Sequence, residues 1–164
     1  PEMRSTGEVL GISKDLGLAF FKAEEAAKPP LPTRGTVLIT VAPRDHQAIL
    51  PAARQFVADG LQLLATEGTL KSLEAAGIPA KAVFKINEGR PNILDELKNG
   101  HIQLVINTPI GKESKIDDSY IRKNAIKYGV PYFTTVAAAL ACANGIHAKL
   151  NGADGVLSIQ EYGR

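Results

Sequence analysis

Two kinds of hydrophobic pattern alternate along the chain from residue 36 onward. Short apolar runs such as TVLITVA lack polar alternation, so they predict strands that are covered on both faces. These runs span residues 36–42, 61–66, 80–86, 102–108 and 131–135. Segments with apolar residues at helical spacing lie between them and predict helices over residues 46–60, 67–77, 91–100, 119–129 and 136–150. This alternation with short links predicts an α/β fold, a doubly wound, mostly parallel five-stranded sheet with helices on both faces.

Proline and glycine refine the expected ends of these elements. Pro91 is expected at the first position of its helix, where the missing N–H costs little. Pro51 predicts an irregular first turn for the helix over residues 46–60. Glycines that commonly close helices follow three of the predicted helices, at Gly60, Gly77 and Gly100. A short closing strand is expected over residues 155–160.

A proline-rich stretch, KPPLPTRG, separates this alternating region from the start of the chain. Its closely spaced prolines cannot continue a helix and favour an extended connection. Residues 13–28 have helical spacing with Ser13 as a cap, and such a helix needs a partner surface. We therefore expect residues 1–35 to be the end of a preceding domain with its linker, and residues 36–164 to form a second domain.

Composition and charge exclude several classes of function. A net charge of +2 without a Lys/Arg run argues against nucleic-acid binding. No apolar stretch is long enough to span a membrane, and no signal peptide is visible. The single cysteine, Cys142, lies among alanines, which predicts buried packing and suits a reducing cytoplasm. The three histidines are far apart in sequence and lack ligand spacing, so no metal site is expected.

Polar residues gather where the predicted strands end, and in such sheets ligands bind at that edge. The segment ATEGTL places Thr66, Gly68 and Thr69 at a strand-to-helix turn. Free N–H groups at the helix start would suit a phosphate or carboxylate. The same residues are equally ordinary as a helix cap and a turn, so both interpretations stand at this point.

Lys85 favours the ligand interpretation, because it follows Val83 by two residues in a strand covered on both faces. Its side chain then points the same way as that of Val83, and a lysine there suits the open end of the sheet, where it meets an anion. The alternative is a lysine that reaches past the sheet edge into water. His46 alone is a weak signal, and residues 107–119 are expected to form a polar, flexible loop that is either solvated or a lid over ligand.

Four segments of the chain carry a resemblance to a known family. PEMRSTGEVLGI at the start resembles the end of the second ATP-using half of carbamoyl phosphate synthetase large chains. LLATEGT, INEGRPNILDELKNG and VINTP then follow in the order seen in their C-terminal regulatory domain, which is similar to methylglyoxal synthase. The resemblance covers essentially the whole chain. It implies that the chain is the C-terminal part of such a large subunit, with a methylglyoxal synthase-like allosteric domain.

The resemblance also implies a role and partners. The parent enzyme makes carbamoyl phosphate from glutamine or ammonia, bicarbonate and ATP, for pyrimidine and arginine biosynthesis. Its ATP, Mg and K are used elsewhere, so no cofactor is expected in this chain. The partners implied are the rest of the large chain, the glutaminase small subunit, and the effectors uridine monophosphate (UMP), inosine monophosphate (IMP) and ornithine. Animal urea-cycle relatives bind N-acetylglutamate instead, and self-association is a further possibility.

The family's nucleotide site maps onto residues already selected from the strand ends. These residues are Thr40, Thr66, Gly68, Thr69, Lys85 and Asn107, with His46 beside them. The chain has His46 where bacterial members can have a lysine, and Pro109 where they can have a threonine, and both changes remove polar contacts. Tyr132 and Thr134 match the region where ornithine lies between this domain and its neighbour.

The turn formed by residues 88–91, after the third predicted strand, decides between a binding and a catalytic role. Methylglyoxal synthase has a catalytic aspartate after its third strand, and the nearest match here is Arg90, which cannot act as a base. Glu88 lies two residues away, which in a turn changes the direction of the side chain. We therefore expect no catalytic residue in this chain. The alternatives are a methylglyoxal synthase-type lyase, the similarly folded cyclohydrolase half of the bifunctional purine enzyme, whose Lys/His-rich stretch is missing, and a structural oligomerisation module.

Overall fold

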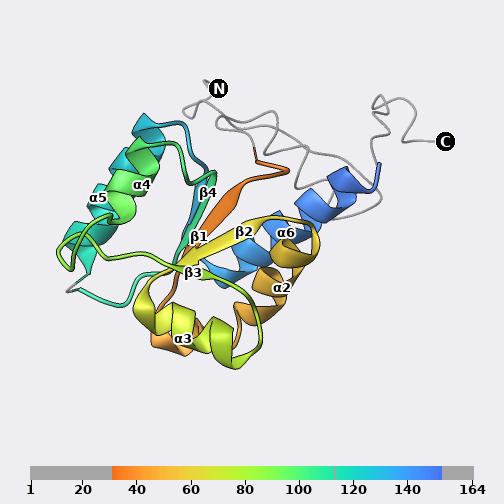
Figure 1. Cartoon of the computed structure of the whole chain (residues 1–164), viewed down its shortest axis with the longest axis horizontal. Coiled ribbons are helices and arrows are strands. Elements are labelled where there is room, and N and C mark those ends of the chain that lie inside the picture. Colours follow the sequence, from red (N-terminus) through yellow and green to blue (C-terminus); the bar gives the residue numbers. More distant parts are fainter. Residues whose placement is uncertain (1–30, 113, 153–164) are drawn as a thin grey trace, which may run out of the picture.

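The computed structural model describes residues 31–112 and 114–152, and within them a five-stranded parallel sheet lies between two layers of helices (Figure 1). The strands are β1 (Thr36–Thr40), β2 (Gln62–Ala65), β3 (Lys81–Ala82), β4 (Leu104–Asn107) and β5 (Tyr132–Phe133). Their order in the sheet is β3-β2-β1-β4-β5, and all four pairings are parallel. The predicted doubly wound α/β fold is confirmed.

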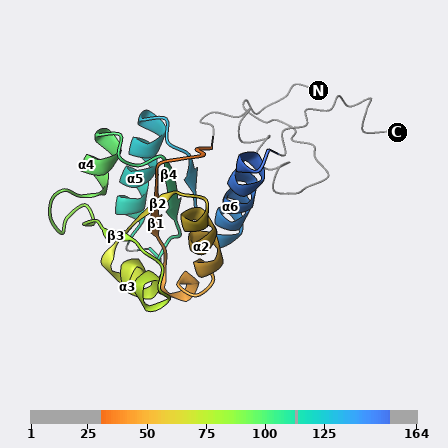
Figure 2. The same ribbon diagram turned by 45° about the vertical axis from the view of Figure 1, so that its right-hand side comes forward.

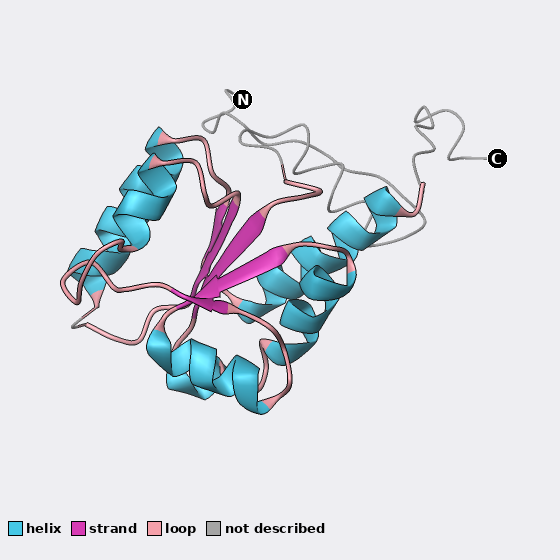
Figure 3. Ribbon diagram, in the orientation of Figure 1, coloured by secondary structure: helices cyan, strands magenta, loops and turns pink. Residues whose placement is uncertain are grey.

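The helices divide between the two faces of the sheet. They are η1 (Pro43–Asp45), α2 (Leu50–Ala58), α3 (Glu67–Ala75), α4 (Ile93–Lys98), α5 (Lys115–Lys127) and α6 (Val136–Leu150). Helices α2 and α6 cover one face together with α3, and α4 and α5 cover the other (Figure 2). The strands therefore lie in the middle of the ribbon, with helices on either side of them (Figure 3).

Strand alternation explains why the apolar runs are continuous. In β1, Val37 and Ile39 belong to the core with α2, α3 and α6, whereas Leu38 belongs to the core with α4 and α5. All three are fully buried. Cys142 is also buried in the first core, as its alanine-rich surroundings predicted.

Several predicted boundaries were wrong at the starts of helices. The helix expected from residue 46 begins at Leu50, preceded by η1, because Pro51 fits only the first turn of a helix. Pro91 is not the first residue of α4. Asn92 is the N-cap, since its side chain accepts from the N–H groups of Leu94 and Asp95, and the Asp95 carboxylate accepts from the N–H of Asn92 at 3.0 Å.

Two other expectations missed the extent of an element. Residues 115–118 were expected in a flexible loop, but they form the first turn of α5, with Asp117 and Asp118 near its positive end. The strand expected over residues 80–86 is reduced to Lys81–Ala82, followed by a single bridge between Phe84 and Asn92. By contrast, α6 has the predicted bounds, and Gly60 and Gly100 follow their helices with positive φ.

Three expectations lie outside the described residues. They are the helix over residues 13–28, the closing strand over residues 155–160 and the role of residues 1–30 as the end of another domain. The division at residue 35 stays a prediction. Leu31, on the N-terminal side of that division, is buried in the core with α2 and α6.

Candidate functional site

The strand order places a topological switch point between β1 and β4. The chain runs from β1 outward through β2 to β3 and then crosses to β4 on the other side of β1. Ligands of open α/β sheets bind at the carboxyl ends of the strands at such a point. Thr40 and Asn107, both predicted site residues, are direct partners in the register of these two strands.

A small cavity opens at this switch point. It has a volume of about 90 Å³, and its lining includes Thr40, Lys85, Asn107, Thr108 and Ile121. Three residues predicted from separate segments therefore converge on one cavity. Its volume equals roughly three waters at about 30 Å³ each, so a larger ligand here must extend outside the cavity or open it.

The threonines beside this cavity are bonded mainly to one another and to the backbone. The hydroxyls of Thr40 and Thr66 lie 3.0 Å apart. The Thr69 hydroxyl accepts from the Val41 N–H at 3.1 Å and is fully engaged at a buried position. The side chain of Thr66 does not cap α3, although Thr66 is its N-cap. What this turn offers a ligand is thus chiefly its backbone N–H groups at Gly68 and Thr69.

His46 lies against the same turn. Its Nδ1 is 2.9 Å from the Ser72 hydroxyl, and its Cε1 is 3.8 Å from the position where a Cβ on Gly68 would be. The imidazole therefore covers the start of α3 and is partly buried there. Because Gly68 has no side chain, the backbone of this turn stays accessible between the His46 imidazole and the sheet.

Lys85 has the direction that strand alternation predicted. Val83 packs in the core with Ile93 and Ile121, and Lys85 lines the cavity together with the same two isoleucines. The Lys85 ammonium lies 3.9 Å from the Glu88 carboxylate, and both side chains are about half exposed. Because such an exposed pair is weak, an anionic ligand is able to replace Glu88 as the partner of Lys85.

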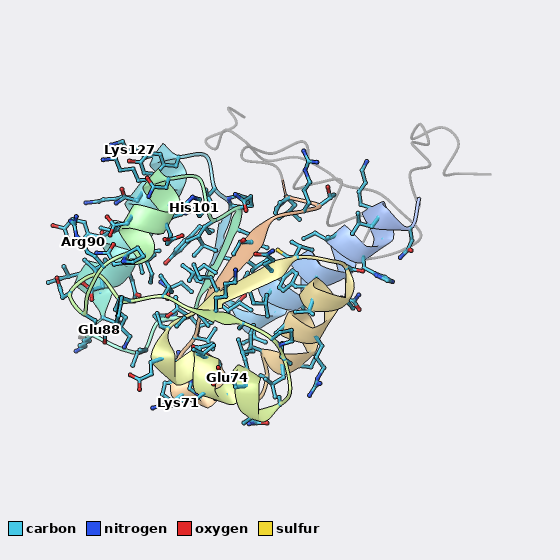
Figure 4. The ribbon with its side chains drawn as sticks, in the orientation of Figure 1. Lys71, Glu74, Glu88, Arg90, His101 and Lys127 are labelled. Carbon is cyan, nitrogen blue, oxygen red and sulfur yellow. The ribbon has the colours of Figure 1, made fainter. Side chains whose placement is uncertain are left out.

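The corner before α4 keeps Glu88 and Arg90 outside the cavity. Figure 4 shows both on the loop at the periphery of the molecule. Arg90 lies 3.9 Å from the Asp95 carboxylate and its side chain is 83% exposed. Neither residue lines the switch-point cavity. This corner therefore contributes no carboxylate that could act as a base at the switch-point cavity.

Asn107 connects the switch point to α5. Its Nδ2 donates to Oδ1 of Asp118 at 2.9 Å and to the Tyr132 hydroxyl at 2.8 Å. Burial raises the pKa of the Tyr132 phenol, although the hydrogen bond from Asn107 opposes this shift. The Ser114 hydroxyl donates to the second oxygen of Asp118. The Asn107 side chain is therefore held in one orientation by α5 and β5 together.

Tyr132 and Thr134 line a separate, larger hollow of about 380 Å³. Asn107, Pro109 and Asp118 also line it, together with Lys115, Ser119 and Arg122. It is therefore adjacent to the switch-point cavity, which shares Asn107 and Asp118. The predicted ornithine contacts lie here, and their role stays a prediction.

Sequence reasoning missed the contribution of α5 to both hollows. Lys115, Asp118 and Arg122 were assigned to a loop or left unremarked, yet all three face the end of the sheet. The signal was present in the spacing, because residues 115, 118, 119 and 122 fall on one face of a helix. Thr108 was likewise missed as a structural link. Its hydroxyl donates to Asp45 at 2.7 Å and accepts from the N–H of Ala42.

Within residues 31–112 and 114–152, no group of three or more His, Cys, Asp or Glu side chains is arranged to hold a metal ion. In the same part of the chain, no helix has the length and apolar character needed to cross a membrane.

Comparison with known proteins identifies the family. The family described as "MGS-like domain" matches residues 48–134, more than half of the chain, from the start of α2 to the end of β5. The chain belongs to the MGS-like domain family. The matched residues include Thr66, Lys85 and Asn107.

The relatives by sequence are carbamoyl phosphate synthase large chains. The large chain of Methanothrix thermoacetophila is 48% identical over all 164 residues, and the match covers 15% of that protein. The large chain, C-terminal section, of Aquifex aeolicus is 49% identical over 89% of this chain and 27% of that protein. The chain thus spans between a seventh and about a quarter of the length of these relatives.

A solved structure supports the fold alone. Methylglyoxal synthase from Elizabethkingia anophelis has a TM-score of 0.54 and 16% identity, over 66% of this chain and 76% of that chain. At this identity the likeness concerns the arrangement of strands and helices, and it carries no argument about catalysis.

Proposed function

We propose that this chain is the effector-binding domain of a carbamoyl phosphate synthetase large chain, and that it binds a nucleoside monophosphate at the switch point. The parent enzyme would then make carbamoyl phosphate for pyrimidine and arginine biosynthesis. Its partners would be the rest of the large chain and the glutaminase small subunit. The proposal is supported by the near-complete coverage of this chain in matches to large chains from several organisms.

The observation that carries the binding proposal is the convergence of Thr40, Lys85 and Asn107 on one cavity. The effector phosphate is placed at the N–H groups of Gly68 and Thr69 and paired with Lys85, because a helix N-terminus and a cation both favour a dianion. The ribose and base then extend toward Asn107 and Ile121. Since the cavity holds only about 90 Å³, the ribose and base must extend beyond it.

Two features support a regulatory rather than a catalytic role. The position nearest to the aspartate of methylglyoxal synthase is Arg90, whose guanidinium faces Asp95 and solvent. Glu88, the neighbouring carboxylate, faces Lys85. In the intact enzyme, effector binding needs to contribute about 1–3 kcal/mol of coupling to change the affinity at distant sites. UMP and IMP are the nucleotides that the family resemblance implies, with ornithine as a separate activator.

Calorimetric titration of the 164-residue chain with UMP, IMP and N-acetylglutamate tests the proposal. We expect micromolar binding of a nucleotide by the wild type. Lys85→Ala should weaken it by about 10- to 150-fold, the loss expected for one charge-assisted bond worth about 1.5–3 kcal/mol.

Lys81→Ala is the matched control. It removes the same charge from β3 but lies at the opposite end of the sheet, in a hollow with His101 and Gln103. Equal binding by Lys85→Ala and wild type would place the phosphate elsewhere. If none of the three ligands gives a binding heat, effector binding by this chain is contradicted. Turnover of dihydroxyacetone phosphate would contradict the non-catalytic assignment.

A further inference from the structure

A hollow of about 430 Å³ lies where α3 packs beside the edge strand β3 (Figure 1). Its lining residues are Glu67 and Leu70 from α3, Ala82, Val83 and Phe84 from the edge of the sheet, and Glu88 from the turn that follows. None of these residues lines the switch-point cavity or the hollow at Tyr132 and Thr134. A concave space of this volume is of the size that proteins use for small molecules.

Phe84 forms an apolar wall of this hollow and is 48% exposed. A Cβ on Gly89 would lie only 3.0–3.2 Å from three atoms of the Phe84 ring, so the backbone of the turn lies directly against the ring. Leu70, which is partly buried, and Val83, which is buried, add aliphatic surface. The hollow therefore offers a ligand an aromatic ring, supported from behind by Gly89, and two aliphatic side chains.

The charged groups that line the hollow are acidic. They are the carboxylates of Glu67 and Glu88, and no lysine or arginine of residues 31–112 and 114–152 joins them. Lys71 lies 2.7 Å from Glu67 and Lys85 lies 3.9 Å from Glu88, and all four side chains are about half exposed or more. The hydrogen bond from Lys71 lowers the pKa of Glu67, which stays ionised at neutral pH. Because exposed ion pairs are weak, a cationic ligand is able to replace either lysine.

We propose that this hollow is a binding site for a free organic amine whose ammonium group is carried on an apolar, aromatic body. The body packs against Phe84, Leu70 and Val83, and its burial supplies most of the affinity. The ammonium pairs with Glu67 and Glu88 and is attracted by the Phe84 ring. The two carboxylates repel anions, so the ligand class differs from the nucleoside monophosphate proposed for the switch point.

The pair formed by Lys85 and Glu88 connects the two sites. Lys85 lines the switch-point cavity and Glu88 lines the hollow at Phe84. An amine that takes Glu88 leaves Lys85 free for a phosphate, and a phosphate that takes Lys85 leaves Glu88 free for the amine. Each ligand therefore favours the binding of the other by the same factor. This coupling rests on the proposed nucleotide function, whereas amine binding does not.

Titration of the ¹⁵N-labelled 164-residue chain with phenethylamine, at constant pH and ionic strength, tests the proposal. We expect saturable changes in the amide signals of α3 and of residues 82–89. The probe 2-phenylethanol has the same body without the charge and should bind about 3-fold more weakly, and 3-phenylpropionate, with the opposite charge, more weakly still. Glu67→Gln should raise the Kd of phenethylamine by about 3-fold, and Phe84→Ala by about 10-fold, because it removes the apolar wall.

Glu74→Gln is the matched control, because it removes the same charge from an exposed position of α3 outside the hollow (Figure 4). Equal weakening by Glu74→Gln and Glu67→Gln would indicate a diffuse charge effect and overturn the site. Equal affinity for phenethylamine and 2-phenylethanol would overturn the selection of a cation. Absence of saturable changes on α3 would overturn the site as a whole.

Nucleotide and amine binding can fail independently of each other. Saturation with the nucleotide that binds best should lower the Kd of phenethylamine by about 2-fold, the effect expected for one exposed ion pair. An unchanged or raised Kd would overturn the coupling. Binding of phenethylamine by a chain that binds no nucleotide would uphold this site and contradict the proposed function.

Discussion

The two sides of the switch point use their polar residues differently. On the α3 side, the hydroxyls of Thr40, Thr66 and Thr69 are bonded within the sheet edge. Apart from the Lys85 ammonium, the groups left for a ligand there belong to the backbone. On the α5 side, Arg122 and Lys115 project as charged side chains into a hollow. Polar side chains at the strand ends thus serve structure on the α3 side, whereas on the α5 side charged side chains of a helix line a hollow.

This difference separates stability from binding. Substitutions of the buried polar residues should chiefly lower the free energy of unfolding, because they leave partners unsatisfied in the interior. Substitutions of the exposed cations should chiefly lower affinity, because those side chains contribute little to the folded state. Asn107 lies between the two groups, since it is buried and yet lines both hollows.

The largest effect is expected from Asn107→Asp. It replaces the amide donor with a second carboxylate against Asp118, which lies 2.9 Å from the present amide nitrogen. We expect a loss of about 3–5 kcal/mol of unfolding free energy at neutral pH, as for an uncompensated buried charge. Urea denaturation measures it. Like charges at this distance raise the pKa of one carboxylate, so acidification should restore part of the lost stability.

The double variant Asn107→Asp/Asp118→Asn is the control for this prediction. It exchanges donor and acceptor and leaves one carboxylate in the pair. Recovery of most of the lost stability would confirm that the repulsion is responsible. If the double variant is as unstable as the single one, the contact between Asn107 and Asp118 does not control stability.

A smaller effect is expected from Thr69→Val. This nearly isosteric change removes the hydroxyl that accepts from the Val41 N–H and leaves that buried group unpaired. The free energy of unfolding should fall by about 1–3 kcal/mol. Nucleotide affinity of the folded protein should change less, because the N–H of residue 69 remains. Thr134→Val, at an exposed threonine, should leave stability unchanged, and an equal loss in both variants would break the comparison.

The smallest effect concerns the Tyr132 phenol. Burial raises its pKa above the ordinary value near 10, so the folded chain holds this proton more tightly than the unfolded chain. The stability from this group is therefore complete below about pH 10 and is lost as the pH rises through the folded pKa. The phenolate absorbance of Tyr132 is the difference between the absorbance of the wild type and that of Tyr132→Phe. Plotted against pH, this difference should have its midpoint above pH 10 in the folded chain and near pH 10 in urea. Identical midpoints would contradict the buried position.

Much of the fold followed from local pattern. The helix Val136–Leu150 had its predicted bounds because its alanine-rich sequence favours a helix from Thr135 onward, and Thr135 caps it. The start of α4 was misjudged because Asn92 and Asp95 form a reciprocal cap that outweighs the preference of Pro91 for the first position. The start of α5 was missed because its polar first turn, KIDD, resembles a loop in composition.

The candidate site divides in the same way. Thr40, Lys85 and Asn107 were selected from the ends of apolar runs, and the structure brings them to one cavity. Nothing in the local sequence predicts that the Thr69 hydroxyl binds the backbone of Val41, 28 residues away. The contribution of α5 was equally hidden, since it depends on the helix starting at Lys115.

By itself, the sequence determined the α/β alternation and the kinds of polar group that follow the strands, because these depend on periodicity and on neighbours along the chain. Only the tertiary structure decided which groups remain open to a ligand. Arg122 on α5 makes no ion pair within residues 31–112 and 114–152. Register pairs Thr40 with Asn107, and packing commits the Thr69 hydroxyl to the backbone of Val41, directly after β1. These partners are distant in sequence, and they come within reach of one another only once the sheet has assembled.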